Sequence, residues 1–261
     1  MSVENITKIL CYIYPISKEK ITYKNVSFEP VKHLYLRKTL FCKDECLLCS
    51  RCCIAEDNIY LPFEVNNMYY ELQRKEIDTV LHKLNGKGYS NIEELIDSLE
   101  EISVVINDKK FKLFKSSLTP NTYTFEDRGE LKRCHWDLPT EDGRLGCGIH
   151  TVSSLTCKMP HIRFLHNSKT NTTSIGHSQY GRNWALKCPA NVSKTEYSDD
   201  SFNTVISNFE LLKKYCEYFE IDTYCDDILK ILYKIREQGI ETCVNYCDKD
   251  IVEHRRKLFN V

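Results

Sequence analysis

The stretch "CKDECLLCSRCC", residues 42–53, places six cysteines among twelve residues. Three kinds of structure use thiols at this density: a disulfide knot, a core that packs cysteines, and a loop that holds a metal. Disulfides persist in oxidising compartments, whereas the cytosol keeps thiols reduced, and a dense cysteine pattern in a reduced chain indicates metal binding. The interpretation of the run therefore depends on the compartment.

The N-terminal residues bear on that compartment. The segment "MSVENITKILCYIYPISKEK" has no basic leader, and its short apolar run ends at Pro15, so we expect no secretory signal. No window of the sequence reaches the roughly 18 apolar residues of a membrane helix. We therefore expect a cytoplasmic chain with reduced thiols and no membrane partner.

Charge and length set further bounds. The 261 residues include 36 basic and 37 acidic side chains, and the formal net charge is −1. This balance gives no electrostatic footprint for DNA or RNA, so no nucleic-acid partner is indicated. The length allows one large domain or two small ones. We expect a cysteine-cluster metal-binding domain at 1–195 and a helical C-terminal subdomain or extension at 196–261.

The hydrophobic pattern mixes period two with helical spacing. Alternation at 33–41 predicts a strand, and two hairpins are predicted, one turning at Asn107–Asp108 and one near 167–170. Between the hairpins, 134–160 is rich in turn residues, as suits a loop organised by a ligand. The sequence therefore predicts an α+β fold: a small mixed or antiparallel sheet with metal-organised loops, followed by a mostly helical C-terminal part.

Apolar residues at helical spacing mark the predicted helices. Their apolar faces comprise Val65, Met68, Tyr69 and Leu72; Val80, Leu81 and Leu84; Ile92, Leu95, Ile96 and Leu99; Phe209, Leu212, Cys216 and Phe219; and Ile228, Ile231, Leu232 and Ile235. Ser90 and Glu93 have the spacing of a capping box, and Asp226 is the predicted N-cap of its helix. A last helix is predicted at 243–259.

The tightest metal signal is Cys46-x2-Cys49-x2-Cys52-Cys53. Two-residue gaps let successive thiolates converge on one ion or cluster, and both zinc and iron–sulfur sites use this spacing. Cys42-x3-Cys46-x2-Cys49 also has the spacing of radical S-adenosylmethionine enzymes. The strand–helix repeat of a β/α barrel is not visible, however, so we interpret Cys42 as a buried or free thiol.

The cysteine run resembles the CxxCxxCC signature of the YkgJ-type cysteine-cluster proteins, a family of proposed zinc or iron chelators. A second family element is similar to residues 147–160, where Cys147 and Cys157 keep the nine-residue gap and Ile149 is shared. "IYLPFEV", with Glu64, resembles the family's I-x-L-x-x-x-E segment. The chain departs from the family at four positions, with His150 for Tyr, Ser153–Ser154 for Arg-Pro, Lys158 for Arg, and Pro160 one residue early. The resemblance spans about 42–190.

The resemblance implies eight candidate metal ligands, of which the first four are the primary cofactor-binding set: Cys46, Cys49, Cys52, Cys53, Cys134, Cys147, Cys157 and Cys188. These thiols serve one four-ligand site with spares or two such sites. The family's similarity to flagellin lysine methylases favours an iron–sulfur cluster, of the 4Fe–4S type, with zinc as the alternative. S-adenosylmethionine is a further cofactor hypothesis, without a motif of its own.

Two functions follow from this resemblance. One is a protein-modifying enzyme of the lysine-methylase type, with a protein substrate. The alternative is a non-catalytic zinc- or iron-binding module for metal handling, sensing or partner docking. No catalytic residue can be named. His150 is the histidine best placed to replace a cysteine ligand, and five further cysteines are interpreted as core packing: Cys11, Cys216, Cys225, Cys243 and Cys247.

Overall fold

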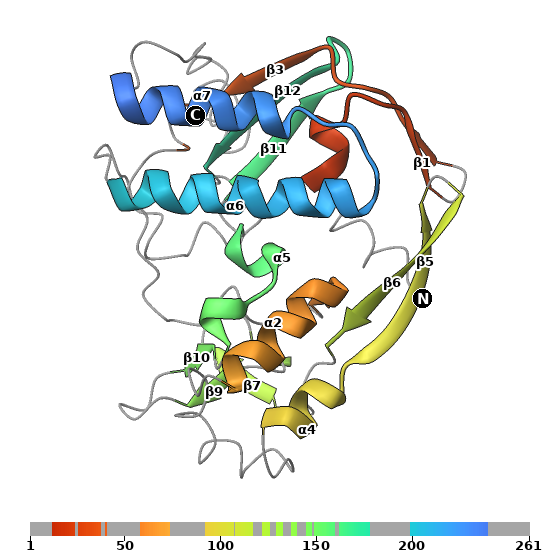
Figure 1. The fold of residues 1–261 in the computed structure, drawn as a ribbon, viewed down its shortest axis with the longest axis vertical. Coiled ribbons are helices and arrows are strands. Elements are labelled where there is room, and N and C mark those ends of the chain that lie inside the picture. The colour runs from red at the N-terminus through yellow and green to blue at the C-terminus, as the bar shows by residue number, and fades with distance from the viewer. Residues whose placement is uncertain are drawn as a thin grey trace. The chain divides into compact units, whose positions relative to one another are not determined.

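The computed structural model describes residues 12–23, 26–37, 40, 58–73, 92–106, 108–116, 122–125, 129–132, 137–139, 145–147, 149–159, 162–177 and 199–239 (Figure 1). The chain forms two compact units. The first comprises Met1–Lys8 and Cys46–Met159, and the second comprises Ile9–Glu45 and Pro160–Val261. The C-terminal helices group with segments that precede and follow the first unit in the sequence. The domain boundary expected near residue 195 stays a prediction.

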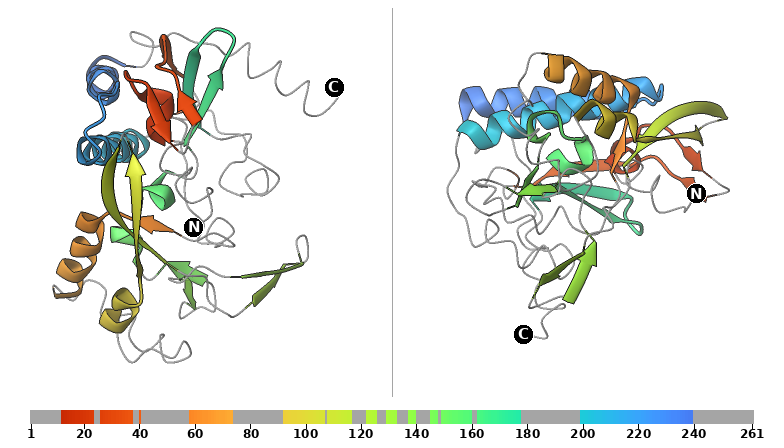
Figure 2. Two further views of the ribbon diagram at one scale, coloured as in Figure 1. Left: turned by 90° about the vertical axis from the view of Figure 1, so that its right-hand side faces the viewer. Right: turned by 90° about the horizontal axis from the view of Figure 1, so that it is seen from below.

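A three-stranded antiparallel sheet lies in the first unit. Its strands are β4 (Ile59–Tyr60), β5 (Glu100–Ile106) and β6 (Lys109–Lys115), in the order β4-β6-β5. Strands β5 and β6 form the curved ribbon seen in Figure 2. Every second side chain of β5 is buried, as its sequence alternation predicts. The hairpin predicted at Asn107–Asp108 is confirmed, with Ile106 opposite Lys109.

Two helices pack in the same unit. Helix α2 (Pro62–Gln73) follows β4 directly, and α4 (Ile92–Asp97) precedes β5. The apolar stripe predicted a helix as far as Leu99, but α4 ends at Asp97. The reason is that β5 begins at Glu100, where period-two burial replaces the helical period. The phenol of Tyr69 on α2 donates a hydrogen bond to the Asp97 carboxylate and so links the two helices.

Short elements complete the first unit. Two hairpins comprise β7 (Thr122–Phe125) with β8 (Gly129–Lys132), and β9 (Asp137–Pro139) with β10 (Leu145–Cys147). The 3-10 turn η5 (His150–Val152) and helix α5 (Leu155–Lys158) follow. The described residues of the segment 134–160 thus form short strands, a 3-10 turn and a one-turn helix, in agreement with its lack of periodicity.

The second unit contains a mixed sheet of order β11-β12-β3. Strands β11 (Ile162–Asn167) and β12 (Thr172–His177) form the hairpin predicted from the sequence, and β12 pairs in parallel with β3 (His33–Leu36). Preceding β3 are the 3-10 turn η1 (Tyr14–Ile16) and the pair β1 (Ile21–Tyr23) and β2 (Val26–Phe28). The parallel pairing joins segments about 140 residues apart and ties the N-terminal part of the chain to the C-terminal part.

Helices α6 (Asp199–Tyr218) and α7 (Cys225–Gln238) pack side by side in this unit (Figure 1). The apolar faces predicted for the two helices are buried as expected. On α6 the buried residues are Phe209, Leu212, Cys216 and Phe219; on α7 they are Ile228, Leu232 and Ile235, and Ile231 is half-buried. The prediction that Asp226 is the N-cap of α7 is wrong, because the N-cap is Tyr224. Asp226 lies in the first turn, where its carboxylate accepts a hydrogen bond from Lys213.

The architecture is therefore α+β, as the sequence pattern predicts. Within the ranges given above, no helix combines the length and apolar character needed to cross a bilayer. The predicted helical face at 80–84 and the last helix at 243–259 lie outside the residues that the structure describes.

Candidate functional site

A buried carboxylate connects two chain segments that the sequence singles out. Glu64 lies in the first turn of α2 and is 4% exposed. Its Oε2 accepts a hydrogen bond from the Leu61 amide at 2.9 Å, as a capping-box glutamate does. Its Oε1 accepts from the amide of Leu155, the first residue of α5, at 3.2 Å. Glu64 thereby fixes α5, which carries Cys157, against the start of α2.

The thiol of Cys157 lies between two polar side chains. Its Sγ is 3.4 Å from the hydroxyl of Ser154, which donates to it, and 3.4 Å from Oδ1 of Asn58, to which the thiol donates. Ser154 is the buried N-cap residue of α5. The side chain of Cys157 remains partly exposed and forms no disulfide. Its sulfur is therefore oriented by two hydrogen bonds on a partly exposed residue.

Asn58 is itself held by the sheet. Its amide donates to Oγ of Ser116 at 3.0 Å, and its carbonyl accepts from the Ser116 amide at 2.9 Å. Ser116 directly follows β6 and is 1% exposed, so this contact anchors residue 58 at the C-terminal end of that strand. Residue 58 is the fifth after Cys53, so Cys157 contacts a residue that is close in sequence to the cysteine run.

Lys158 brings a cation to the same place. Burial lowers the pKa of its ammonium group, and the negative charges of Glu64 and Cys157 partly oppose that shift. A cation beside Cys157 stabilises the thiolate, which is the form of cysteine that binds metals.

Cys147 ends strand β10, where the backbone register places it opposite Asp137. Cys134 is three residues before Asp137 in the sequence and lies outside the described residues. Cys147 is partly exposed and forms no disulfide.

Two of the eight predicted ligands, Cys147 and Cys157, lie within the described ranges. The other six lie outside them: Cys46, Cys49, Cys52, Cys53, Cys134 and Cys188. Among the residues that the structure does describe, no group of three or more His, Cys, Asp or Glu side chains is arranged to hold a metal ion. His150 begins η5 and is exposed.

Sequence reasoning missed Asn58. Its only sequence signal is its place between the cysteine run and the "IYLPFEV" segment, and its partners Ser116 and Cys157 are distant in sequence. Of the cysteines interpreted as core packing, Cys216 and Cys225 are buried as expected. Cys11, Cys42, Cys243 and Cys247 lie outside the part that the structure describes.

Comparison of the chain with protein-family models, with curated proteins and with solved structures found no match.

Proposed function

We propose that this protein binds a metal through its clustered cysteines, as an iron–sulfur cluster with zinc as the alternative, in the reducing cytoplasm. One observation carries the proposal: the sulfur of Cys157 lies 3.4 Å from Asn58, the residue at which the chain emerges from the cysteine run. A ligand expected from one motif thereby contacts a residue that follows the other motif by five positions in the sequence.

Sequence separation relates two further candidate ligands to described residues. Cys53 is five residues before Asn58, and Cys134 is three residues before Asp137, which is opposite Cys147 in the β9–β10 pair. Two of the candidate ligands are therefore close in sequence to residues that contact Cys157 or oppose Cys147.

The groups around Cys157 fit a metal-bound thiolate. A thiolate only accepts hydrogen bonds, and Ser154 already donates to this sulfur. The amide of Asn58 becomes a second donor if its NH2 group turns toward the sulfur. The Lys158 ammonium offsets part of the negative charge that several thiolates bring together. An iron–sulfur cluster bound here supplies electron transfer or a structural cross-link.

Metal analysis tests this proposal directly. The full chain is purified without oxygen, its iron, sulfide and zinc are measured, and its visible spectrum is recorded. We expect bound metal, with less of it in Cys157→Ser and Cys147→Ser. Cys216→Ser is the matched control, because Cys216 is a buried thiol that is not among the candidate ligands. A folded wild-type protein that is colourless and free of metal contradicts the proposal.

The coordination of the metal then separates the two functions. A position that binds an exogenous ligand favours an enzyme of the lysine-methylase type acting on a protein substrate, whereas four closed thiolates favour a non-catalytic module. S-adenosylmethionine binding, measured by calorimetry on the metal-loaded protein, is the second discriminating measurement. Absence of binding argues against the methylase and leaves the metal module.

A further inference from the structure

The sheet β11-β12-β3 has two chemically different faces. Directly paired residues have their side chains on the same side of a sheet. One face is mainly apolar, with Phe164 beside Ile175 and Ile175 beside Leu36. The ring of Tyr12 packs against Phe164 on this face, with 5.8 Å between the ring centroids. The opposite face carries polar side chains, among them Tyr35, Thr172, Ser174, Arg163 and Asn167, and none of the three strands contains Asp or Glu.

Two arginines flank Gly176 on this polar face. Arg163 is opposite Gly176 in the β11–β12 pair. On the other side, the amide of Arg37 donates to the carbonyl of Ile175 at 2.7 Å, so the parallel pairing continues one residue beyond β3 and brings Arg37 beside Gly176. Neighbouring strands are about 4.8 Å apart, which places the α-carbons of the two arginines about 10 Å apart. Because the residue between them is glycine, the central strand contributes no side chain that separates them.

This row of residues has little contact with solvent. Arg37 is 8% exposed, Gly176 is buried, and Arg163 is half-buried. Ser174, the next residue of β12 on the same face, is 7% exposed. Buried polar side chains are more informative than buried apolar ones, because taking them from water is costly unless they form hydrogen bonds. The row therefore places two guanidinium groups and a hydroxyl group where an acceptor for their hydrogen bonds stabilises them.

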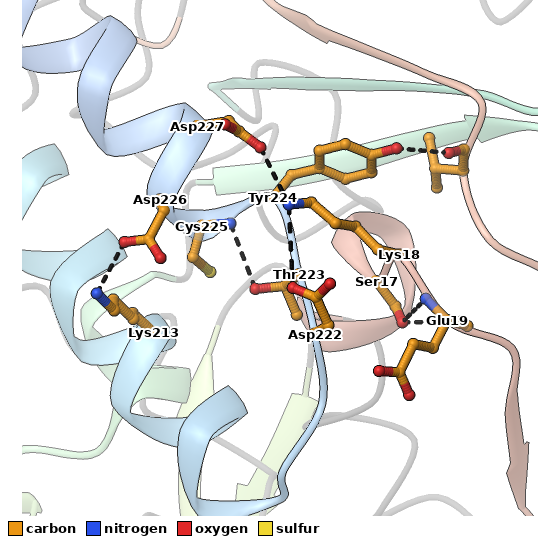
Figure 3. Close-up of polar contacts among 11 residues, drawn as sticks. Ser17, Lys18, Glu19, Lys213, Asp222, Thr223, Tyr224, Cys225, Asp226 and Asp227 are labelled. Atoms are coloured by element: carbon orange, nitrogen blue, oxygen red, sulfur yellow. Dashed lines mark hydrogen bonds and ion pairs between the residues drawn. The ribbon is translucent and has the colours of Figure 1, made fainter.

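A group of carboxylates in the same unit lies at the other end of β3. The phenol of Tyr224, the residue before α7, donates to the carbonyl of Val31 at 3.2 Å, and Val31 precedes β3 by two residues. Arg37, by contrast, follows the last residue of β3. The carboxylates beside Tyr224 pair with lysines, as Figure 3 shows: Asp222 and Asp227 with Lys18, and Asp226 with Lys213.

We propose that Arg37 and Arg163 bind the phosphate group of a small phosphorylated molecule above Gly176. A guanidinium group presents a planar fork of N–H donors that matches the oxygens of a phosphate, and two such cations match the charge of a phosphate dianion. Each guanidinium has five N–H donors, so an arginine that also contacts a protein group keeps donors for a ligand. The missing side chain at Gly176 lets the phosphate approach the backbone of the central strand, and the Ser174 hydroxyl is a further donor. This site is independent of the proposed metal site.

Binding measurements on the full chain test the proposal. Inorganic phosphate and glycerol phosphate are each titrated by calorimetry, with the ionic strength held constant by potassium chloride. We expect both to bind saturably, one per chain, and the tighter of the two identifies free phosphate or a phosphate ester as the better ligand. Arg163→Gln loses hydrogen bonds to a charged group, so we expect affinity about 10–100-fold weaker. Arg236→Gln is the matched control, because Arg236 is an exposed arginine on α7 of the same unit.

Three results of the titrations overturn the proposal: no saturable binding of either probe to the wild type, unchanged affinity in Arg163→Gln, or an equal loss in Arg163→Gln and Arg236→Gln. Circular dichroism establishes that each variant is folded. If Arg163→Gln is not, arginine modification of the native wild-type chain by phenylglyoxal, followed by digestion and mass spectrometry, replaces it. We expect phosphate to slow the modification of Arg163 severalfold and to leave that of Arg236 unchanged. Equal rates at Arg163 with and without phosphate overturn the proposal.

Discussion

Replacing Glu64 by Gln tests the contact that positions α5. The carboxylate accepts two backbone hydrogen bonds in a site with almost no solvent, from Leu61 at 2.9 Å and from Leu155 at 3.2 Å. A hydrogen bond to a charged group contributes about 1.5–3 kcal/mol, and a buried donor left without an acceptor costs about 1–3 kcal/mol. Glutamine keeps one acceptor and turns an NH2 group toward the other amide. We therefore expect a loss of about 2–3 kcal/mol of stability.

The assay combines urea denaturation with hydrogen exchange. For an m-value of about 2 kcal/mol/M, the expected loss lowers the urea midpoint by roughly 1–1.5 M. Exchange of the Leu61 or Leu155 amide accelerates at the same time. Glu101→Gln is the matched control in the same unit, because its carboxylate forms an exposed ion pair with Lys112, a kind of contact worth about 0–1 kcal/mol. Equal midpoints for the two variants, with unchanged exchange at both amides, refute the reasoning.

Three further predictions concern single side chains. Glu220 follows α6 in the left-handed region at φ 51°, and the Ile221 amide donates to the carbonyl of Cys216, as in a Schellman helix end. Glu220→Gly therefore raises the free energy of unfolding by roughly 1 kcal/mol, whereas Glu217→Gly, inside α6, lowers it by about 0.5–1 kcal/mol. Thermal unfolding measures both, and a loss of stability in both variants contradicts this helix-end geometry. Burial, and then the hydrogen bond to Asp97, raise the pKa of Tyr69 to about 12. This contact therefore stabilises the fold fully below pH 10, and the stabilisation is lost as the pH rises toward 12. Asp97→Asn moves the tyrosinate absorbance transition of Tyr69 back toward pH 10, and an unmoved transition contradicts this cause. Ser154→Ala removes the hydrogen-bond donor to Cys157. For the metal site proposed above, we expect this variant to retain the metal about 10–100-fold less well against a chelator. A variant that keeps its metal as well as the wild type argues against a role of Ser154 in metal binding.

Local patterns were predictable from the sequence, and long-range pairings were not. Both hairpins follow from alternation around polar turns, and the buried faces of α6 and α7 follow from helical spacing. The end of α4 was misjudged because Leu99 fits the helical stripe although a strand begins one residue later. The parallel pairing of β3 with β12 has no local signal, since nothing in either strand specifies its partner.

At the candidate site, too, local features were predictable from the sequence and long-range contacts were not. The resemblance singled out Glu64, but its hydrogen bond to Leu155 joins residues 91 positions apart, and no spacing rule reveals such a contact. Asn58 was overlooked because an asparagine after a cysteine run has many ordinary roles. Asp226 has the composition of an N-cap, yet its carboxylate pairs with Lys213 on the preceding helix, so a long-range ion pair replaced the local cap.

The parallel pairing of β3 with β12 has a consequence for biosynthesis. The second unit takes one strand of its sheet from the beginning of the chain and the rest from beyond residue 160, so the nascent polypeptide cannot complete it until most of the protein has left the ribosome. The continuous stretch 46–159 emerges earlier and has its own sheet. A growing chain can therefore fold the continuous stretch 46–159 first, while strand β3 has no partner until β12 is translated about 140 residues later.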